Sequence, residues 1–349
     1  MDLKNIQWFE FIFEDIFKIY STSSGIDKNK LNSKKGSIPY ITRTDKNNAI
    51  DFFIGEQDEK YKKEINNVIT IGLDTQTVFY QKHEFYTGQN IQILQNEDLN
   101  QYNANFLIPL IKKQMVKFNW GGNGATLTRL KRSKIILPSK KGKPDFLFME
   151  QFIREKENEK LNQFKNYIYK RINEVKDFKE VKSINEKVWE EFYLNEIFTH
   201  IQRGKRLKKD DHKKGKIPYV SSTSLNNGID SYVGNTKNVR VFSNCLTIAN
   251  SGSVGETFYQ PFSVIASDHV TKLENNELNS YTYLFISTVS KRLSEKYSFN
   301  REINDNRIQK EKILLPINSK KEPDYEYMEN YIKKIEFEKL NKYIQRING

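Results

Sequence analysis

One pair of motifs in the sequence is compatible with a known catalytic pattern. Pro144-Asp145, followed by Glu174-Val-Lys176, fits the PD…ExK arrangement, in which acidic side chains hold Mg²⁺ for hydrolysis of DNA. Glu-x-Lys triplets arise easily in segments rich in Lys and Glu, and residues 180–182 form another one. Asp324, the counterpart of Asp145 in the second half of the chain, is followed by no such triplet. We therefore interpret Asp145 as a helix cap.

Other catalytic signatures are missing from the sequence. It contains no Walker A motif, no dinucleotide-binding glycine fingerprint, no G-x-S-x-G elbow and no HExxH. The Asn-Pro-Pro-Tyr or Asp-Pro-Pro-Tyr string that an amino-methyltransferase would need is absent as well. The single cysteine, Cys245, excludes an internal disulfide framework and a zinc site of several cysteines, and the four histidines are scattered. We expect a chain without an active site that binds no metal or cofactor.

Polar residues gather in turns of three kinds, each of which occurs twice. One turn follows an Ile-Pro-Tyr segment, one follows a short apolar strand, and one precedes a strand that ends in Pro. Asn, Gln and Arg can read base edges, whereas Ser, Thr and Lys contact phosphate. Solvation explains any one of these residues, but the repeated set favours DNA recognition. The candidate DNA-binding residues are Lys34, Lys35, Thr42, Arg43, Thr44, Asn47, Asn48, Thr75, Gln76, Asn123, Thr126 and Arg129 in the first half, and Arg203, Lys205, Arg206, Ser221, Ser222, Thr223, Asn226, Asn227, Ser251, Ser253, Arg301, Asn304, Asn306 and Arg307 in the second.

The charge balance supports an anionic partner. The 349 residues include 57 Lys and Arg against 44 Asp and Glu, which gives a net charge of +13. Residues 203–209 hold five positive charges, and we expect phosphate contacts there. No run of eighteen apolar residues exists, so we expect a cytoplasmic protein with no membrane partner.

The elements that position these turns also occur twice. The segments 36–41, 79–81 and 144–150 all return at one constant offset, as 215–220, 258–260 and 323–329. Because this offset far exceeds the period of a solenoid repeat, it indicates a tandem duplication of one domain. Each half begins with a β-rich region and ends in a long amphipathic helix, at 145–172 and 324–347, preceded by Pro-Asp.

This order resembles the specificity (S) subunit of Type I restriction-modification systems over essentially the whole chain. The resemblance rests on the Ile-Pro-Tyr segments, on Ser251-Gly-Ser-Val-Gly255, on the 124–128 loop before Ile135-Ile-Leu-Pro138, and on the helices after Pro-Asp-(Phe/Tyr)-x-(Phe/Tyr)-Met-Glu. The Met-Glu variant is also similar to S subunits of Type IIB-like systems, whose partner is a fused nuclease-methyltransferase. Residues 73–77 depart from the family because they lack the Gly-Ser-x-Gly turn.

The resemblance implies an α+β fold with two tandem target recognition domains, at 1–144 and 189–322. The helices at 145–173 and 323–349, with a linker at 174–188, would pair as an antiparallel coiled coil. The stretch 145–172 would span about 42 Å as a helix, a little over one turn of B-DNA. We therefore expect a target of two short, different half-sites whose centres lie roughly one turn apart.

The resemblance also implies the partners. The chain would bind double-stranded DNA together with methyltransferase (M) subunits, which use S-adenosylmethionine to methylate adenine, or with a fused nuclease-methyltransferase. In the Type I arrangement a translocase/nuclease (R) subunit would add ATP- and Mg²⁺-dependent cleavage. Two alternatives remain open: a stand-alone Mg²⁺-dependent nuclease that uses Asp145 and Glu174, and an anti-restriction or regulatory DNA-binding protein on the same scaffold.

Overall fold

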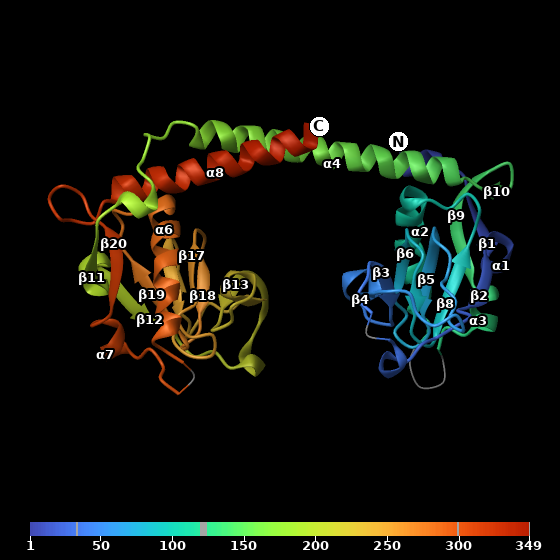
Figure 1. Cartoon of the computed structure of the whole chain (residues 1–349), viewed down its shortest axis with the longest axis horizontal. Helices are drawn as coiled ribbons and strands as arrows, with labels where there is room; N and C mark the ends of the chain where they lie inside the picture. Colours follow the sequence, from blue (N-terminus) through green and yellow to red (C-terminus); the bar gives the residue numbers. More distant parts are fainter. Residues whose placement is uncertain (33, 119–123, 299, 349) are drawn as a thin grey trace. The chain divides into compact units, whose positions relative to one another are not determined.

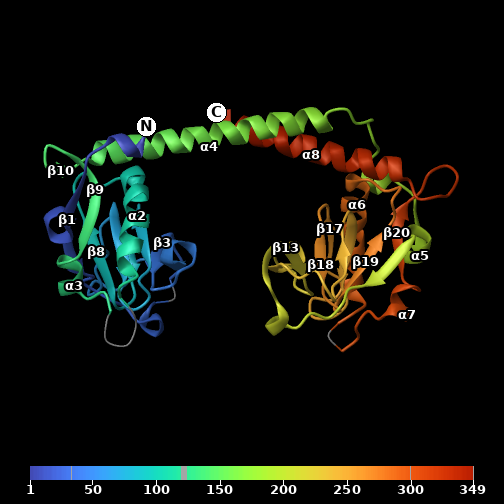
Figure 2. The same ribbon diagram turned by 180° about the vertical axis from the view of Figure 1, so that it is seen from behind.

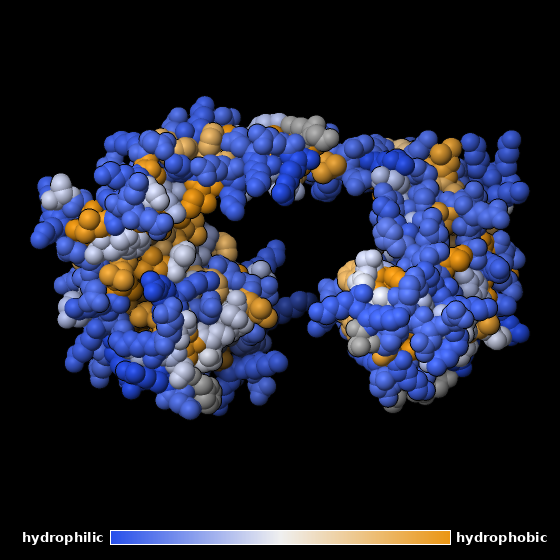
Figure 3. All heavy atoms as spheres, viewed as in Figure 1, coloured by the Kyte–Doolittle hydropathy of each residue, from blue (hydrophilic) through white to orange (hydrophobic). Residues whose placement is uncertain are grey.

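The chain divides into two units, Met1–Phe164 (unit 1) and Lys165–Gly349 (unit 2). The computed structural model describes residues 1–32, 34–118, 124–298 and 300–348. Figure 1 labels the elements of each unit, and Figure 2 shows them from behind. Within the described ranges, no helix has the length and apolar character needed to cross a membrane. In the view of Figure 3, hydrophilic residues cover most of the surface of each unit.

The two units contain the same kinds of element in nearly the same order. From the N-terminus to the long helix of the first half, the elements are η1 (Leu3–Asn5), β1 (Trp8–Ile12), α1 (Phe13–Ile16), β2 (Lys18–Ser21), η2 (Lys28–Lys30), β3 (Ile38–Ile41), η3 (Asn47–Ala49), β4 (Ile50–Ile54), β5 (Val68–Gly72), β6 (Val78–Gln81), β7 (Tyr86–Thr87), β8 (Ile91–Gln95), α2 (Gln101–Met115), α3 (Leu127–Lys131), β9 (Lys134–Lys140), β10 (Lys143–Pro144) and α4 (Phe146–Val175). They are followed by η4 (Ile184–Glu186), β11 (Trp189–Tyr193), α5 (Leu194–Ile197), β12 (His200–Arg203), η5 (Lys209–Asp211), β13 (Lys214–Val220), η6 (Asn226–Gly228), β14 (Ile229–Val233), β15 (Val241–Phe242), β16 (Cys245–Ala249), β17 (Thr257–Gln260), β18 (Val264–Ala266), β19 (Val270–Glu274), α6 (Ser280–Ser290), η7 (Lys291–Glu295), α7 (Asp305–Ile308), β20 (Lys312–Pro316) and α8 (Tyr325–Asn348).

Each unit is organised around a four-stranded antiparallel sheet. Its strand order is β2-β8-β5-β6 in unit 1 and β12-β19-β16-β17 in unit 2. The central strands β5 and β16 are buried along their whole length, as their apolar sequences predict. A second sheet packs beside the first, in the order β4-β3-β7 in unit 1 and β14-β13-β18-β15 in unit 2.

Strand pairing and ring contacts confirm the internal repeat. Tyr40 pairs with Tyr86 in the parallel β3–β7 ladder, and Tyr219 pairs with Ile265 in the β13–β18 ladder, at the offset of the sequence repeat in both strands. Trp8 stacks on Phe106 in unit 1, as Trp189 stacks on Phe285 in unit 2. The α+β fold with duplicated β-rich domains is therefore confirmed.

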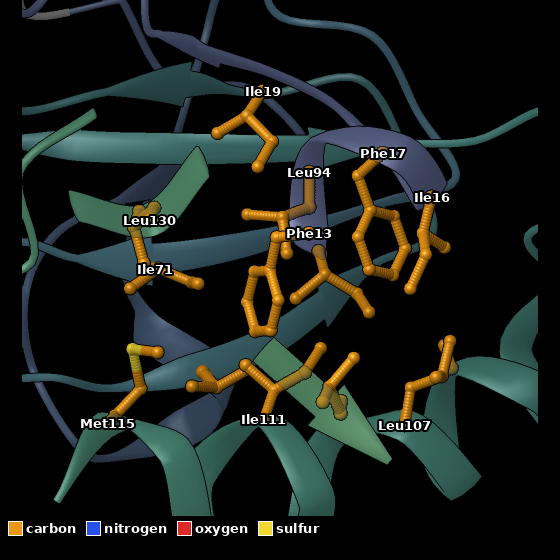
Figure 4. Packing of buried hydrophobic residues seen from close by; sticks show 14 of the residues in the cluster. Phe13, Ile16, Phe17, Ile19, Ile71, Leu94, Leu107, Ile111, Met115 and Leu130 are labelled. Atoms are coloured by element: carbon orange, nitrogen blue, oxygen red, sulfur yellow. The ribbon is translucent and has the colours of Figure 1, made fainter. Parts of the chain in front are cut away.

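The core of unit 1 lies between the main sheet and helix α2. Phe13, Ile71, Leu94, Leu107 and Ile111 point toward one another there and are fully buried (Figure 4). The corresponding core of unit 2 uses α6 in place of α2. Burial on this scale fixes the sheet and therefore the loops at its ends.

The long helices begin where the sequence predicts. The Asp145 carboxylate accepts a hydrogen bond from the Phe148 N–H at 2.9 Å, and Asp324 accepts one from the Tyr327 N–H at 3.0 Å. The interpretation of Asp145 as a helix cap is thus confirmed. Glu174 lies near the other end of α4, where it pairs with Arg171 at 2.8 Å. Two residues near opposite ends of one long helix cannot ligate a common ion, so the PD…ExK interpretation is not supported.

Within unit 2, the end of α4 lies beside α8 (Figure 2). Arg171 donates from Nε to Glu336 at 2.5 Å and from Nη2 to the second carboxylate oxygen at 3.0 Å. Further along the chain, the Lys182 carbonyl accepts a hydrogen bond from the Tyr327 hydroxyl at 3.1 Å. The later residue, Lys182, thus contacts an earlier residue of α8 than Arg171 does. The segment 171–182 therefore runs antiparallel to α8. Pairing of the two helices along a full coiled coil stays a prediction.

The lone cysteine gives a simple check on the packing of unit 2. Cys245 is fully buried at the start of β16, and its burial raises the pKa of the thiol to about 12. We expect it to resist a maleimide reagent at pH 8 in the folded chain and to react once denaturant unfolds unit 2. Rapid stoichiometric labelling of the folded chain would contradict this packing.

Candidate nucleic-acid interface

The strand register gives each main sheet two different ends. In unit 2, β16 ends at Ala249, which pairs with Val270 at the start of β19, and β12 ends nearby at Arg203. The other end of β19 leads into α6, whose N-cap residue Asn279 donates to Glu329 of α8 at 2.6 Å. In unit 1, Asn100 at the start of α2 donates to Glu150 of α4 in the same way, at 2.8 Å. One end of each sheet is thus attached to the long helix, and the other end carries loops.

We call the loop-bearing end the recognition end. In unit 1 it comprises the segments 42–44, 73–77, 88–90 and 124–129. The recognition end of the second unit comprises the segments 203–206, 221–223, 250–255, 267–269 and 301–307. Figure 1 shows α3 at this end of unit 1, away from α4, and α7 at this end of unit 2, away from α8. Most of the candidate DNA-binding residues lie here.

Backbone hydrogen bonds bring the predicted turns together in unit 1. The Leu73 carbonyl accepts from the Ala125 N–H at 3.1 Å, and the Leu73 N–H donates to the Asn90 carbonyl at 3.0 Å. The Gly88 N–H donates to the Ile41 carbonyl at 2.8 Å, which holds the turn after β3 in the same group. Three turns that are far apart in the sequence therefore form one surface.

Unit 2 repeats the arrangement with different residues. The Asn250 carbonyl accepts from the Ile303 N–H at 3.0 Å, and the Asn250 N–H donates to the His269 carbonyl at 2.8 Å. The Ser222 carbonyl accepts from the Ser253 N–H at 3.0 Å. The predicted turns at 221–223, 250–255 and 301–307 are thus neighbours.

The Asn-Asn pairs have a structural reason. Asn47 and Asn48 have φ values of 49° and 56°, and Asn226 and Asn227 have values of 49° and 58°. Asn tolerates this left-handed region better than most residues. The Asn48 amide also donates to the Tyr80 carbonyl at 2.9 Å, as Asn227 donates to Tyr259 at 3.1 Å. Asn48 and Asn227 therefore hold the turn to β6 and β17, whereas Asn47 and Asn226 supply only the left-handed backbone, and all four residues are exposed.

The basic segment after β12 divides into a structural and an exposed part. Arg203 pairs with Asp305 at 2.9 Å and donates to the Ile303 carbonyl at 3.3 Å, which ties β12 to the turn around α7. A Cβ atom added to Gly204 would lie 2.1 Å from the Ser267 carbonyl oxygen, so only glycine fits this approach. Lys205 and Arg206 follow and are exposed at the recognition end.

Taken together, the candidate DNA-binding residues fall into three groups. Side chains with hydrogen bonds inside the protein are those of Arg43, Thr44, Asn48, Thr75, Gln76, Arg129, Arg203, Thr223, Asn227, Ser251, Asn304 and Arg307. Exposed or half-buried positions at the recognition end are Thr42, Thr126, Lys205, Arg206, Ser221, Ser222, Ser253, Arg301 and Asn306, and Asn47 and Asn226 are exposed in the turns that adjoin it. Lys34 and Lys35 lie at the opposite end of β3 from Thr42, and Asn123 lies outside the described residues.

The structure also adds residues that the sequence pattern did not single out. Asp74, Asn90 and His269 belong to the recognition end, where Asp74 contacts the predicted Arg43, Asn90 contacts Asp74, and His269 contacts the predicted Ser251. Asn90 and His269 directly precede the strands β8 and β19, whereas the predicted turns at 73–77 and 250–255 follow β5 and β16. The available signal was that these two residues are separated by the offset of the internal repeat.

Comparisons with known proteins agree with this geometry. Residues 5–166 and 186–348 each match the family described as the Type I restriction modification DNA specificity domain. The chain is 33% identical over 335 residues to the specificity subunit S.BcgI of a Type II restriction enzyme from Heyndrickxia coagulans, a match that covers 95% of both chains. Its fold is similar to the crystal structure of the S subunit of a Type I restriction-modification system from M. genitalium, with a TM-score of 0.57 and 17% identity over 100% of this chain and 94% of that one.

Proposed function

Because the chain belongs to the family of Type I restriction modification DNA specificity domains, we propose that each unit reads one half of a bipartite, asymmetric DNA site through its recognition end. The chain is a specificity subunit of a restriction-modification system and serves DNA recognition rather than catalysis. Each recognition end would therefore meet its own short stretch of base pairs.

One observation carries this proposal. The two recognition ends share their backbone arrangement but differ in side chains: Leu73 and Asn250 form equivalent hydrogen bonds, yet the turns that follow them are Asp-Thr-Gln-Thr and Ser-Gly-Ser-Val-Gly. Phosphate positions are the same in every duplex, whereas base edges differ. Two different half-sites require two recognition ends that have the same backbone arrangement and different polar side chains.

We propose that the chemistry resides in partner subunits. A methyltransferase that binds S-adenosylmethionine would methylate adenine at the site chosen by this chain. The 33% identity to a subunit of a Type II restriction enzyme favours a partner that joins nuclease and methyltransferase in one polypeptide, with Mg²⁺ for cleavage. A Type I set with separate methyltransferase subunits and an ATP-driven translocase/nuclease subunit is the second candidate, supported by the family match.

The requirement for a partner is directly testable. The purified chain, incubated with duplex DNA, S-adenosylmethionine and Mg²⁺, should neither methylate nor cleave it. Addition of the methyltransferase encoded beside it should give methylation at a defined sequence, and that methyltransferase alone should give none. Cleavage by the purified chain that is lost in Asp145→Asn would instead support the nuclease alternative, and sequence-specific binding without any effect on methylation would support a regulatory protein.

We further propose that α4 and α8 set the distance between the half-sites. Two observations support this: α4 is one continuous helix from Phe146 to Val175, and its final turns bond to α8 through Arg171 and Glu336. Glu336 accepts hydrogen bonds from Nε and Nη2 of Arg171, and this contact raises the pKa of Arg171, with burial opposing it. A two-pronged Arg–carboxylate contact fixes orientation as well as proximity.

A further inference from the structure

Three positions occupy the same place at the recognition end of both units. They are residues 43, 74 and 90 in the first unit and residues 222, 251 and 269 in the second. The first and third positions keep the constant offset of the repeat. Residues 74 and 251 are separated by two positions fewer than this offset. The segment before β16 is two residues shorter than the segment before β5, and the turn after β16 is two residues longer than the turn after β5. The backbone hydrogen bonds from Leu73 to Asn90 and from Asn250 to His269 confirm this equivalence.

In unit 1 the three side chains form a charged cluster. The Asp74 carboxylate accepts hydrogen bonds from the Arg43 guanidinium and, at 3.5 Å, from the Asn90 amide. The cluster is accessible, since the Arg43 side chain is 41% exposed and Asp74 is 21% exposed. Arg43 and Asn90 are thus held by a common carboxylate at the surface.

In unit 2 the same three positions carry two hydroxyls and an imidazole. The Ser251 hydroxyl is buried and lies 2.7 Å from His269 Nδ1. Ser222 lies beside the turn that carries Ser251, because a Cβ atom added to the next residue, Gly252, would lie 2.8 Å from the Ser222 hydroxyl oxygen. His269 is exposed, and its contact with the buried Ser251 hydroxyl fixes the orientation of the ring. Among the described residues, His269 Nε2 has no hydrogen-bond partner.

We propose that these three positions determine the base sequence read by each unit: Arg43 and Asn90, held by Asp74, read one half-site, and Ser222 and His269, with Ser251 holding the imidazole, read the other. This inference rests on the proposed function and names the side chains that give each unit its sequence specificity. Arg and Asn are the side chains that pair bidentately with guanine and adenine, whereas an imidazole nitrogen offers a single contact. A side chain held in place by a neighbour also loses less conformational entropy on binding.

The shared backbone makes the three positions suited to this task. The carbonyl of residue 90 or 269 is clamped by the same hydrogen bond in both units, so the side chain changes while its backbone anchor does not. By contrast, Asn48 and Asn227 share their residue type, their left-handed conformation and a hydrogen bond to a carbonyl of β6 or β17. Identical residues cannot make two half-sites different, whereas residues 43, 74 and 90 differ from 222, 251 and 269 at every position.

The test uses the full chain with its methyltransferase on plasmids that carry randomised duplex sites, followed by sequencing of the methylated sites. His269→Ala should reduce discrimination at one base pair of one half-site by about tenfold or more. The other half-site and the spacer should stay as in the wild type. The matched control is His200→Ala, an exposed histidine of the same unit at the far end of β12, which should change neither half-site.

A second variant transfers the unit 1 cluster to unit 2. Ser222→Arg, Ser251→Asp and His269→Asn together should change the base preference of the His269 half-site only. Thermal unfolding of each variant shows whether unit 2 still folds, and His269→Ala alone keeps the test decisive if the triple variant does not. Unchanged base preferences in His269→Ala, or changes confined to the other half-site, would overturn the assignment. A wild-type chain that selects no sequence would overturn the proposed function itself.

Discussion

Insertion of one heptad into α4 and one into α8 is expected to lengthen the spacer between the two half-sites by about three base pairs. A heptad of helix adds about 10 Å along the axis, and one turn of B-DNA covers about 34–36 Å. Equivalent insertion points are available after Glu159 and after Glu338, both exposed and both followed by Lys-Leu-Asn. The wild-type site should be lost almost completely, because the two recognition ends would no longer fall on half-sites at the original separation.

The half-sites themselves should not change in this variant, since no residue of the recognition ends is altered. Insertion into α8 alone is the matched control: it leaves the length of α4 unchanged and should create no new defined spacer. Sequencing of methylated sites distinguishes these results. An unchanged spacer, or new half-sites, would mean that the helices do not set the distance.

The second large effect concerns the exposed basic residues after β12. Replacement of Lys205 and Arg206 by Ala should weaken binding to cognate and random duplex alike, because phosphate contacts carry no sequence information. Each lost contact reduces the slope of log K against log salt by about 0.9, so a decrease of about 2 is expected. Affinity measured at several salt concentrations checks both numbers.

The control variant for this prediction has the same charge change at another place. Lys320→Ala with Lys339→Ala removes two exposed lysines near α8 and should leave affinity and salt slope nearly unchanged. Arg203 is left out of the variant because it pairs with Asp305 and supports the turn around α7. A selective loss on the cognate site in Lys205→Ala/Arg206→Ala would indicate base reading rather than phosphate contact.

Much of the fold could be predicted because its signals are local. Pro-Asp before an amphipathic pattern predicted both long helices, and Asp145 and Asp324 indeed cap them. Continuous apolar runs predicted the buried strands β5 and β16. The duplication strengthened each of these predictions, since an element predicted in one half of the chain had to occur again in the other half.

The recognition ends were predictable only in part because their contacts are not local. Asn48 and Asn227 have the side chain of a base reader, but their amides bond to backbone carbonyls 32 residues away. Arg203 looked like a phosphate contact, yet its partner Asp305 lies 102 residues further along the chain. Asn90 and His269 were missed because only the pairing of β5 with β8, and of β16 with β19, brings them beside the predicted turns.

We propose that one chain carries two different DNA-reading units and directs a methyltransferase to the sites that they select. The most direct test is a base-by-base map of all sites methylated by the chain together with its partner. We expect this map to show two short, different half-sites. They should be separated by an unspecified spacer of fixed length, with their centres roughly one turn of DNA apart. A single contiguous sequence, two identical half-sites, or the same methylation map in the absence of this chain would contradict it.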